Sequence, residues 1–215
     1  MKLEVKIFKK LAEYDLDVNF TACENYLGLT GPSGSGKSMI LKCIAGIMKP
    51  DAGRIVLDGQ VLFDSELKIN LPVQKRKIGY MFQSYALFNN MTVYQNIAAP
   101  LKAHHEKKAI IDEKVKQIMK DFHIEALSSR YPRQLSGGQK QRVALARLLV
   151  YDTKLVLLDE PFSALDAELK ETLLNETKSK LQGYHKPCLF VSHSPQEMEF
   201  MCSNILKIKK GRLEK

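Results

Sequence analysis

The 215-residue sequence contains no apolar run long enough to cross a lipid bilayer, and its charged start, Met1-Lys2-Leu3-Glu4, lacks a signal-peptide core. It has no low-complexity stretch and no evident internal repeat. These absences argue against a membrane-spanning chain, a disordered chain and a repeat array. We therefore expect a cytoplasmic protein, for which a role at the membrane would require a membrane-embedded partner.

Metal-binding and redox motifs are also missing. The four cysteines form no C-x-x-C pair and have no metal-ligand spacing, which indicates incidental thiols in a reducing compartment. Adjacent His104 and His105 lie in a lysine-rich stretch that is typical of a solvated helix face. The net charge of +9 suits nucleic acid, an anionic membrane or a nucleotide, but no basic cluster is interleaved with aromatic residues. Nucleic acid is therefore not a predicted partner.

The strongest functional motif in the sequence is rich in glycine and lies between a predicted apolar strand and a predicted helix. Residues 26–30 predict the strand, and residues 39–48 have helical spacing of apolar residues that ends with Ile47. Between them lies a complete G-x-x-x-x-G-K-[ST] motif, made of Gly31, Pro32, Ser33, Gly34, Ser35, Gly36, Lys37 and Ser38. Its backbone N–H groups can cradle phosphate oxygens, Lys37 can reach the β- and γ-phosphates, and Ser38 can ligate Mg²⁺. The motif predicts binding of ATP and Mg²⁺.

Two carboxylates follow a buried strand at residues 155–158. Asp159 stands where ligands bind in open α/β sheets, and we expect it to serve the Mg²⁺ site through a water molecule or through a direct ligand of the ion. Glu160 points in a different direction and is our candidate to polarise the attacking water. The alternative is a helix N-terminus, where acidic residues and Pro161 would both be favoured. The motif at residues 31–38 makes the catalytic interpretation the better one.

A second helix start has the composition of a phosphate cradle. Leu135 is followed by Ser136, Gly137, Gly138 and Gln139, and then by apolar residues at helical spacing. One nucleotide needs only one cradle, so the economical interpretation is that this cradle serves the ATP of a second copy in a two-fold homodimer. The alternative is an ordinary capped helix, because serine with glycine makes a good N-cap.

The order of the expected elements predicts one α/β domain with the P-loop NTPase fold. Alternating residues at 3–7 and 16–20, and a hairpin turning at Asp58-Gly59, indicate an N-terminal antiparallel β-subdomain. Apolar runs that alternate with helices indicate a mostly parallel central sheet. We expect residues 1–83 and 151–215 to form this core, and residues 84–150 to form an inserted helical subdomain.

Residues 135–142 resemble the signature motif of the ATP-binding-cassette (ABC) family, and further motifs of that family follow in the same order over nearly the whole chain. Gln83 matches the Q-loop glutamine, which implies contact with Mg²⁺ or with the attacking water. Ser163-Ala164-Leu165-Asp166 matches the D-loop, which implies that Asp166 lies at the dimer interface near nucleotide. His193 matches the switch histidine that contacts the γ-phosphate. The adenine-stacking aromatic stays open between Phe8 and Tyr14.

The resemblance also implies partners. A single nucleotide-binding domain without a membrane segment is similar to importer ATPases, which act as dimers on the cytoplasmic face of the membrane, beneath permease subunits. The resemblance therefore implies permease subunits as direct partners and a solute-binding protein as an indirect one. Residues 84–91, with Tyr85, Leu87 and Phe88, are expected to form a groove for a permease helix. Residues 54–88 are most similar to molybdate and tungstate importer ATPases. Sulfate, iron or polyamine import, and a non-transport ABC ATPase, are the alternatives.

Overall fold

We describe the fold from a computed structural model that describes residues 1–23, 25–163 and 165–214. One sheet is antiparallel, with the strand order β2-β1-β4-β5-β6. Its strands are β1 (Leu3–Lys10), β2 (Asp15–Ala22), β4 (Ala52–Leu57), β5 (Gln60–Asp64) and β6 (Ile69–Asn70). The turn between β4 and β5 has positive φ angles at Asp58 (47°) and Gly59 (79°), which are typical of a tight hairpin, so the hairpin predicted there is confirmed.

The second sheet has the strand order β11-β10-β3-β9-β8-β7 and is parallel except at the β10–β11 pair. Its strands are β3 (Tyr26–Thr30), β7 (Ile78–Met81), β8 (Leu155–Asp159), β9 (Cys188–Val191), β10 (Asn204–Lys209) and β11 (Arg212–Leu213). Because β3, β8 and β9 run side by side in the same direction, the residues that follow them meet at one edge of the sheet.

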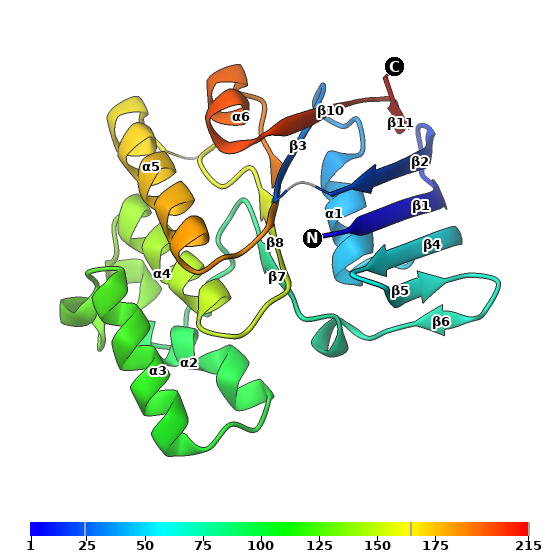
Figure 1. Ribbon diagram of the computed structural model, residues 1–215. Coiled ribbons are helices and arrows are strands. Elements are labelled where there is room, and N and C mark those ends of the chain that lie inside the picture. Colours follow the sequence, from blue (N-terminus) through cyan, green and yellow to red (C-terminus); the bar gives the residue numbers. More distant parts are fainter. Residues whose placement is uncertain (24, 164, 215) are drawn as a thin grey trace.

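Helices cover both faces of the parallel sheet (Figure 1). They are α1 (Lys37–Ala45), α2 (Val93–Ala103), α3 (Lys108–Asp121), α4 (Gly137–Leu149), α5 (Ala167–Gly183) and α6 (Pro195–Met201). Short 3-10 turns lie at η1 (Val73–Lys75), η2 (Glu125–Leu127) and η3 (Pro132–Gln134). Between β7 and β8 the described chain is helical, but the division of the chain at residues 83 and 151 stays a prediction. No helix of the described residues is long and apolar enough to span a membrane.

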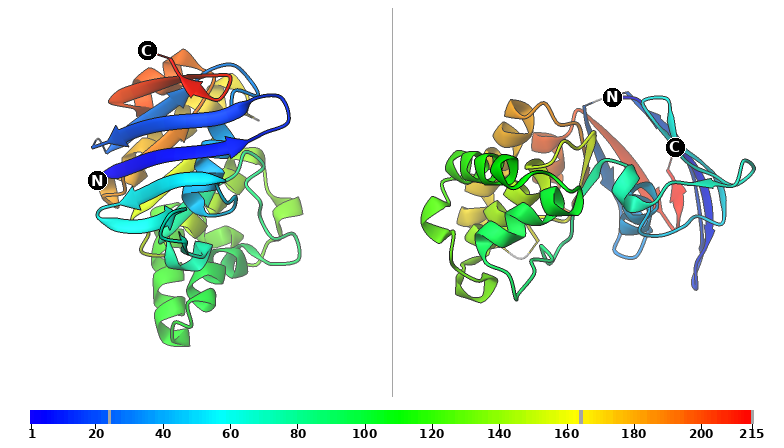
Figure 2. Two further views of the ribbon diagram at one scale, coloured as in Figure 1. Left: turned by 90° about the vertical axis from the view of Figure 1, so that its right-hand side faces the viewer. Right: turned by 90° about the horizontal axis from the view of Figure 1, so that it is seen from below.

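Alternate residues of β8 divide the interior into two cores. Val156 and Leu158 pack with the helices α2 to α6, whereas Leu155 and Leu157 pack with α1 and the antiparallel sheet. Figures 1 and 2 show these two layers on opposite sides of the parallel sheet. The α/β architecture expected from the sequence is therefore confirmed, and α1 and α4, which carry the two predicted cradles, lie on opposite faces.

The predicted helix over residues 39–48 is wrong at both ends. Helix α1 begins at Lys37, directly after the glycine-rich motif, and ends at Ala45. Gly46 has a φ of 82° and its N–H donates to the carbonyl of Cys43, which closes the helix with a left-handed cap. Ile47 is consequently 43% exposed and lies outside the apolar stripe in which the spacing had placed it.

Candidate nucleotide-binding site

The glycine-rich motif forms a loop between β3 and α1 that only glycine allows at several positions. Gly31, Gly34 and Gly36 have φ angles of 147°, 73° and 105°. A Cβ on Gly31 would lie 2.0 Å from the carbonyl oxygen of Ile208 in β10. Gly36 is the N-cap of α1, so the loop ends at the positive end of that helix. The loop has the backbone of a phosphate cradle.

Lys37 is folded back over this loop. Its Nζ donates to the carbonyl oxygens of Gly31 and Pro32, each at 2.8 Å, and the residue is only 4% exposed. Burial lowers the pKa of Lys37, and the carboxylates of Glu160 and Asp159 oppose that shift. The ammonium is therefore held at the loop, between backbone oxygens and two acidic side chains.

The three predicted Mg²⁺ ligands, Ser38, Gln83 and Asp159, line one cavity of about 460 Å³. Ser38 Oγ donates to Asp159 Oδ1 at 2.8 Å, although the two residues are 121 positions apart in the sequence. A hydroxyl, an amide and one carboxylate are oxygen donors of the kind that Mg²⁺ takes together with water and phosphate oxygens. The donor set fits this ion. In the described residues no group of three His, Cys, Asp or Glu side chains could hold a metal ion.

The two predicted catalytic residues after β8 and β9 are in contact. His193 Nε2 lies 2.5 Å from Glu160 Oε1, and the His193 side chain is 43% exposed. Glu160 has a φ of 49°, and its N–H donates to the carbonyl of Val191 in β9 at 3.0 Å. The adjacent carboxylates thus have different partners: Glu160 contacts His193, and Asp159 accepts from Ser38 and Tyr80.

Gln83 joins the same cluster from the loop after β7. Its Nε2 donates to Ser163 Oγ at 3.1 Å, and Ser163 Oγ donates to the backbone oxygen of Glu160 at 3.0 Å. Ser163 belongs to the predicted D-loop, of which Ala164 lies outside the described residues. Asp166 caps α5, accepting a hydrogen bond from the N–H of Leu169 at 3.0 Å. Within one chain, Asp166 thus has a helix-capping role.

The second predicted cradle is satisfied locally. Ser136 is the N-cap of α4, its hydroxyl accepts from the N–H of Gln139, and the Gln139 side chain accepts from the N–H of Ser136 at 3.0 Å. Gly137 and Gly138 open the helix, and a Cβ on Gly138 would come within 3.3 Å of Leu side chains of α5. No hydrogen bond or ion pair among the described residues joins this helix start to residues 31–38. Within the single chain, α4 begins as an ordinary capped helix. That this helix start binds the ATP of a second copy stays a prediction.

One of the two candidate adenine-stacking aromatics lies at the glycine-rich loop. The hydroxyl of Tyr14 donates to the carbonyl oxygen of Gly34. Phe8 lies on β1, where it pairs with Asp17 of β2 and Ala52 of β4 and is 37% exposed. Tyr14 therefore contacts the glycine-rich loop, and the choice between Tyr14 and Phe8 as the adenine-stacking aromatic stays a prediction.

The sequence patterns did not identify two polar residues that contact this site. Tyr80 on β7 donates from its hydroxyl to Asp159 Oδ2 at 2.7 Å, and burial, with a further contribution from Asp159, raises the pKa of this phenol well above its usual value. Arg147 on α4 donates to the backbone oxygens of Tyr85 and Ala86 at 2.7 and 2.8 Å. No local pattern marks either residue, because each partner lies far away in the sequence.

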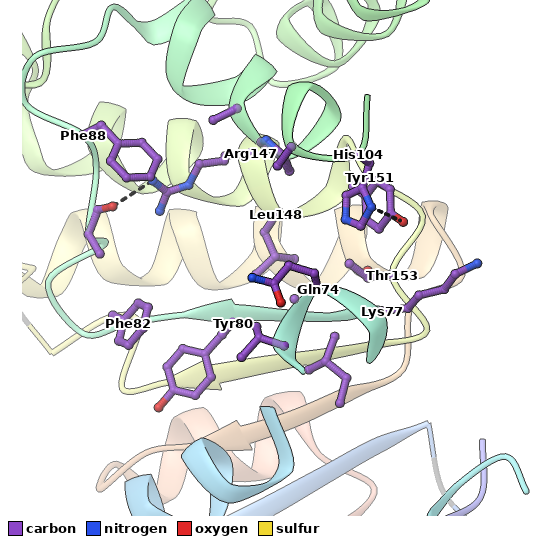
Figure 3. Close-up of a pocket in the computed structure, with 17 residues that line it drawn as sticks. Gln74, Lys77, Tyr80, Phe82, Phe88, His104, Arg147, Leu148, Tyr151 and Thr153 are labelled. Atoms are coloured by element: carbon purple, nitrogen blue, oxygen red, sulfur yellow. Dashed lines mark hydrogen bonds between the residues drawn. The ribbon is translucent and has the colours of Figure 1, made fainter. Parts of the chain in front are cut away.

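Tyr80 and Arg147 also line a groove of about 510 Å³ between β7 and the helices α2 and α4 (Figure 3). Its other labelled lining residues include Phe82, Phe88, His104, Leu148 and Tyr151. Arg147 stands 5.4 Å from the ring centre of Phe88, and His104 stacks on Tyr151 with 4.0 Å between ring centres. Tyr80, Phe82, Phe88 and Tyr151 give this aromatic groove its name, and Phe82 also lines the neighbouring cavity of Ser38 and Asp159.

These features define a class of protein. A glycine-rich loop before α1, an acidic end of β8 and a histidine after β9 together make a P-loop nucleotide-binding domain. Residues 15–163 match the family model described as "ABC transporter". The chain belongs to the ABC transporter family, and the predicted membership of its ATPase domains is confirmed.

Curated relatives and solved structures agree with this assignment. The chain is 42% identical over 207 residues to the sulfate/thiosulfate import ATP-binding protein CysA of Thermosynechococcus vestitus, which covers 96% of this chain and 59% of the relative. It is 43% identical over 197 residues to the molybdate/tungstate import ATP-binding protein WtpC of Methanocaldococcus jannaschii, covering 92% and 63%. The chain thus spans about three fifths of the length of these relatives.

Two solved structures of the ABC cassette MJ0796 share the fold. Both cover 100% of this chain and 97% of their own chain at 28% sequence identity, with TM-scores of 0.81 and 0.82. Both are described as dimeric, and one as a post-hydrolysis state bound to ADP and inorganic phosphate. The likeness over the whole chain confirms the predicted fold class.

Proposed function

We propose that this chain binds and hydrolyses ATP as the energising subunit of an importer of tetrahedral oxyanions. The observation that carries the proposal is the convergence of three segments at one sheet edge. The loop after β3 presents Lys37 and Ser38, β8 ends in Asp159 and Glu160, and His193 follows β9. Each residue has the chemistry that phosphoryl transfer to water requires.

The contacts of these residues assign their roles in hydrolysis. Lys37 neutralises phosphate charge at the loop, and His193 orients the carboxylate of Glu160. Glu160 accepts a proton from water as the water oxygen bonds to the γ-phosphorus; the bond to the bridging oxygen breaks, ADP leaves, and the proton ends on the released phosphate. Mg²⁺, held by Ser38, Asp159 and Gln83, would supply positive charge to the phosphate oxygens.

A homodimer would complete the nucleotide site. The cradle of Ser136 to Gln139 opens α4 on one side of the parallel sheet, whereas the loop of residues 31–38 opens α1 on the other side. A second copy related by a two-fold axis can therefore place its Ser136 cradle, and its Asp166, over the nucleotide of the first. The dimeric description of both MJ0796 structures supports this arrangement.

The aromatic groove beside Tyr80 is the proposed docking place for a permease segment, which would hold the dimer at the cytoplasmic face of a membrane. Phe88 and Ala86 of the predicted segment line this groove. Tyr85 does not, because it is 6% exposed and its hydroxyl lies 3.3 Å from the backbone oxygen of Pro161. Arg147 ties the segment to α4, which begins at the Ser136 cradle, so a shift at the groove would reach the dimer interface.

The solute is proposed from ancestry. The relatives at 42% and 43% identity are named for import of sulfate or thiosulfate and of molybdate or tungstate, which are all tetrahedral oxyanions. Molybdate or tungstate is our first choice within this class. The test is ATP turnover of the complex with its permease and solute-binding protein, with each oxyanion in turn. Stimulation by a cation or a polyamine alone would overturn the choice.

Glu160→Gln tests the hydrolytic assignment. We expect Mg²⁺-dependent hydrolysis to fall by at least about 100-fold, because the variant lacks the general base. ATP binding should persist, so the variant should accumulate as an ATP-bound dimer in size-exclusion chromatography. The matched control is Glu199→Gln, at an exposed glutamate of α6, which should hydrolyse ATP as the wild type does. Unimpaired hydrolysis by Glu160→Gln would remove Glu160 from this role.

A further inference from the structure

The carboxylate of Asp159 receives one hydroxyl on each of its oxygens. Ser38 Oγ donates to Oδ1 at 2.8 Å, and Tyr80 Oη donates to Oδ2 at 2.7 Å. Ser38 comes from the glycine-rich motif, whereas Tyr80 comes from a different strand, β7. Two donors on different oxygens fix the rotation of a carboxylate about its Cβ–Cγ bond, which one donor cannot do.

Tyr80 is itself held rigidly. It pairs with Leu157 in the ladder between β7 and β8, two residues before Asp159 on the neighbouring strand. Its ring lies 4.4 Å, centre to centre, from that of Phe82 and lines the aromatic groove. Figure 3 shows its hydroxyl directed away from the side chains that line the groove. The ring thus lines the groove, whereas the hydroxyl reaches Asp159, which lines the cavity together with Ser38 and Gln83.

Burial makes the hydrogen bond from Tyr80 to Asp159 important for the orientation of the carboxylate. Asp159 is only 7% exposed, and a buried carboxylate depends on protein donors because few water molecules reach it. Lys37 Nζ is engaged by two backbone oxygens and no hydrogen bond between it and Asp159 is found in the described chain. In this structure, therefore, the two hydroxyls are the hydrogen-bond donors that orient Asp159.

We propose that Tyr80 is a positioning residue for the Mg²⁺ site: its hydroxyl holds the Asp159 carboxylate in the orientation that receives the metal of the nucleotide complex. The inference rests on the proposed function, since it assigns Asp159 to Mg²⁺. Groups that orient a metal ligand from behind set the affinity for the metal, and their loss weakens it by about tenfold or more.

Tyr80→Phe separates the hydroxyl from everything else that the side chain does, because the ring remains in the groove and against Phe82. The matched control is Tyr151→Phe, which removes a hydroxyl from the same groove. That hydroxyl lies 3.2 Å from His104 Nδ1 and takes no part in the cavity of Asp159. Any general effect of a lost phenol on this groove should therefore be seen in both variants.

The readout is binding of Mn²⁺, as a paramagnetic stand-in for Mg²⁺, measured by electron paramagnetic resonance with the full chain and a non-hydrolysable ATP analogue. We expect Tyr80→Phe to bind Mn²⁺ about tenfold more weakly than the wild type does. Affinity for the analogue in EDTA and the melting temperature should change little. Tyr151→Phe should match the wild type in all three measurements.

Two results would overturn the inference. Unchanged Mn²⁺ affinity in Tyr80→Phe would show that Ser38 alone orients Asp159. An equal loss of analogue affinity with and without metal would show that the hydroxyl only supports the local fold. A failure of the proposed function is distinguishable from both, because in that case the wild type itself would not bind Mn²⁺ together with the nucleotide analogue.

Discussion

Arg76 offers the sharpest test of how the nucleotide loop is supported. Its side chain is fully buried (0% exposed), and no salt bridge to it is found in the described residues. The guanidinium instead donates to backbone oxygens of Cys43 and Ile44 at 2.9 and 2.8 Å and to that of Leu71 at 2.8 Å. It also donates to the side-chain oxygen of Asn70 at 2.9 Å. Cys43 and Ile44 belong to the last turn of α1, so the cation sits at the negative end of the helix that follows the loop.

Arg76→Met keeps much of the aliphatic stem and removes the guanidinium. Cys43 O would still accept from the N–H of Gly46, but in the described chain Ile44 O and Leu71 O have no second donor. Each buried oxygen left unpaired costs about 1–3 kcal/mol, and the lost cation–helix interaction adds up to about 1 kcal/mol. The variant no longer has to bury a charged guanidinium, which offsets part of this cost. We therefore expect the free energy of unfolding to fall by about 3 kcal/mol.

The assay is thermal unfolding followed by circular dichroism. For a chain of this size about 3 kcal/mol corresponds to a fall in melting temperature of about 6–12 °C. Arg54→Met is the matched control, because Arg54 is 56% exposed and lies 3.5 Å from Asp64. Asp64 is buried but keeps the hydrogen bonds that it accepts from the N–H groups of Glu66 and Leu67, so we expect a loss of less than about 1 kcal/mol. A fall in melting temperature for Arg76→Met no larger than for Arg54→Met would refute the reasoning that neutral oxygens, three of them in the backbone, stabilise this buried cation.

Two further predictions concern the helix starts. A Cβ on Gly138 would lie 3.2–3.3 Å from side-chain carbons of Leu169 and Leu173, so Gly138→Val should destabilise the α4–α5 contact by about 1–3 kcal/mol in urea unfolding. The control is Gly183→Val, because a Cβ on Gly183 would face open space, and its free energy of unfolding should stay within about 0.5 kcal/mol of the wild type. Equal losses of stability in the two variants would contradict the packing argument. Because burial lowers the pKa of Lys37 below 10.5, the unfolded chain binds that proton more tightly. The nucleotide-free wild type should therefore gain stability relative to Lys37→Met as the pH rises toward 10.5, and a constant difference in melting temperature would contradict this.

Much of the site was predictable because its motifs are local. The glycines at 31, 34 and 36 are required by the positive φ angles of one continuous loop, and an apolar run before Asp159 marks a strand buried on both faces. The end of α1 was not predictable from spacing, since the apolar period continues through Ile47. A single left-handed glycine, Gly46, ends the helix two residues earlier.

The sequence by itself determined the chemistry: which loop can hold phosphate, which strand ends in carboxylates, and the family to which the chain belongs. Tertiary structure decided which side chains contact one another. It brought Tyr80 to Asp159, His193 to Glu160 and Tyr14 to the glycine-rich loop, and it placed α1 and α4 on opposite faces of the sheet. The physical reason is that a motif is read from the order of neighbouring residues, whereas a contact between strand ends depends on the strand order and register of the whole sheet.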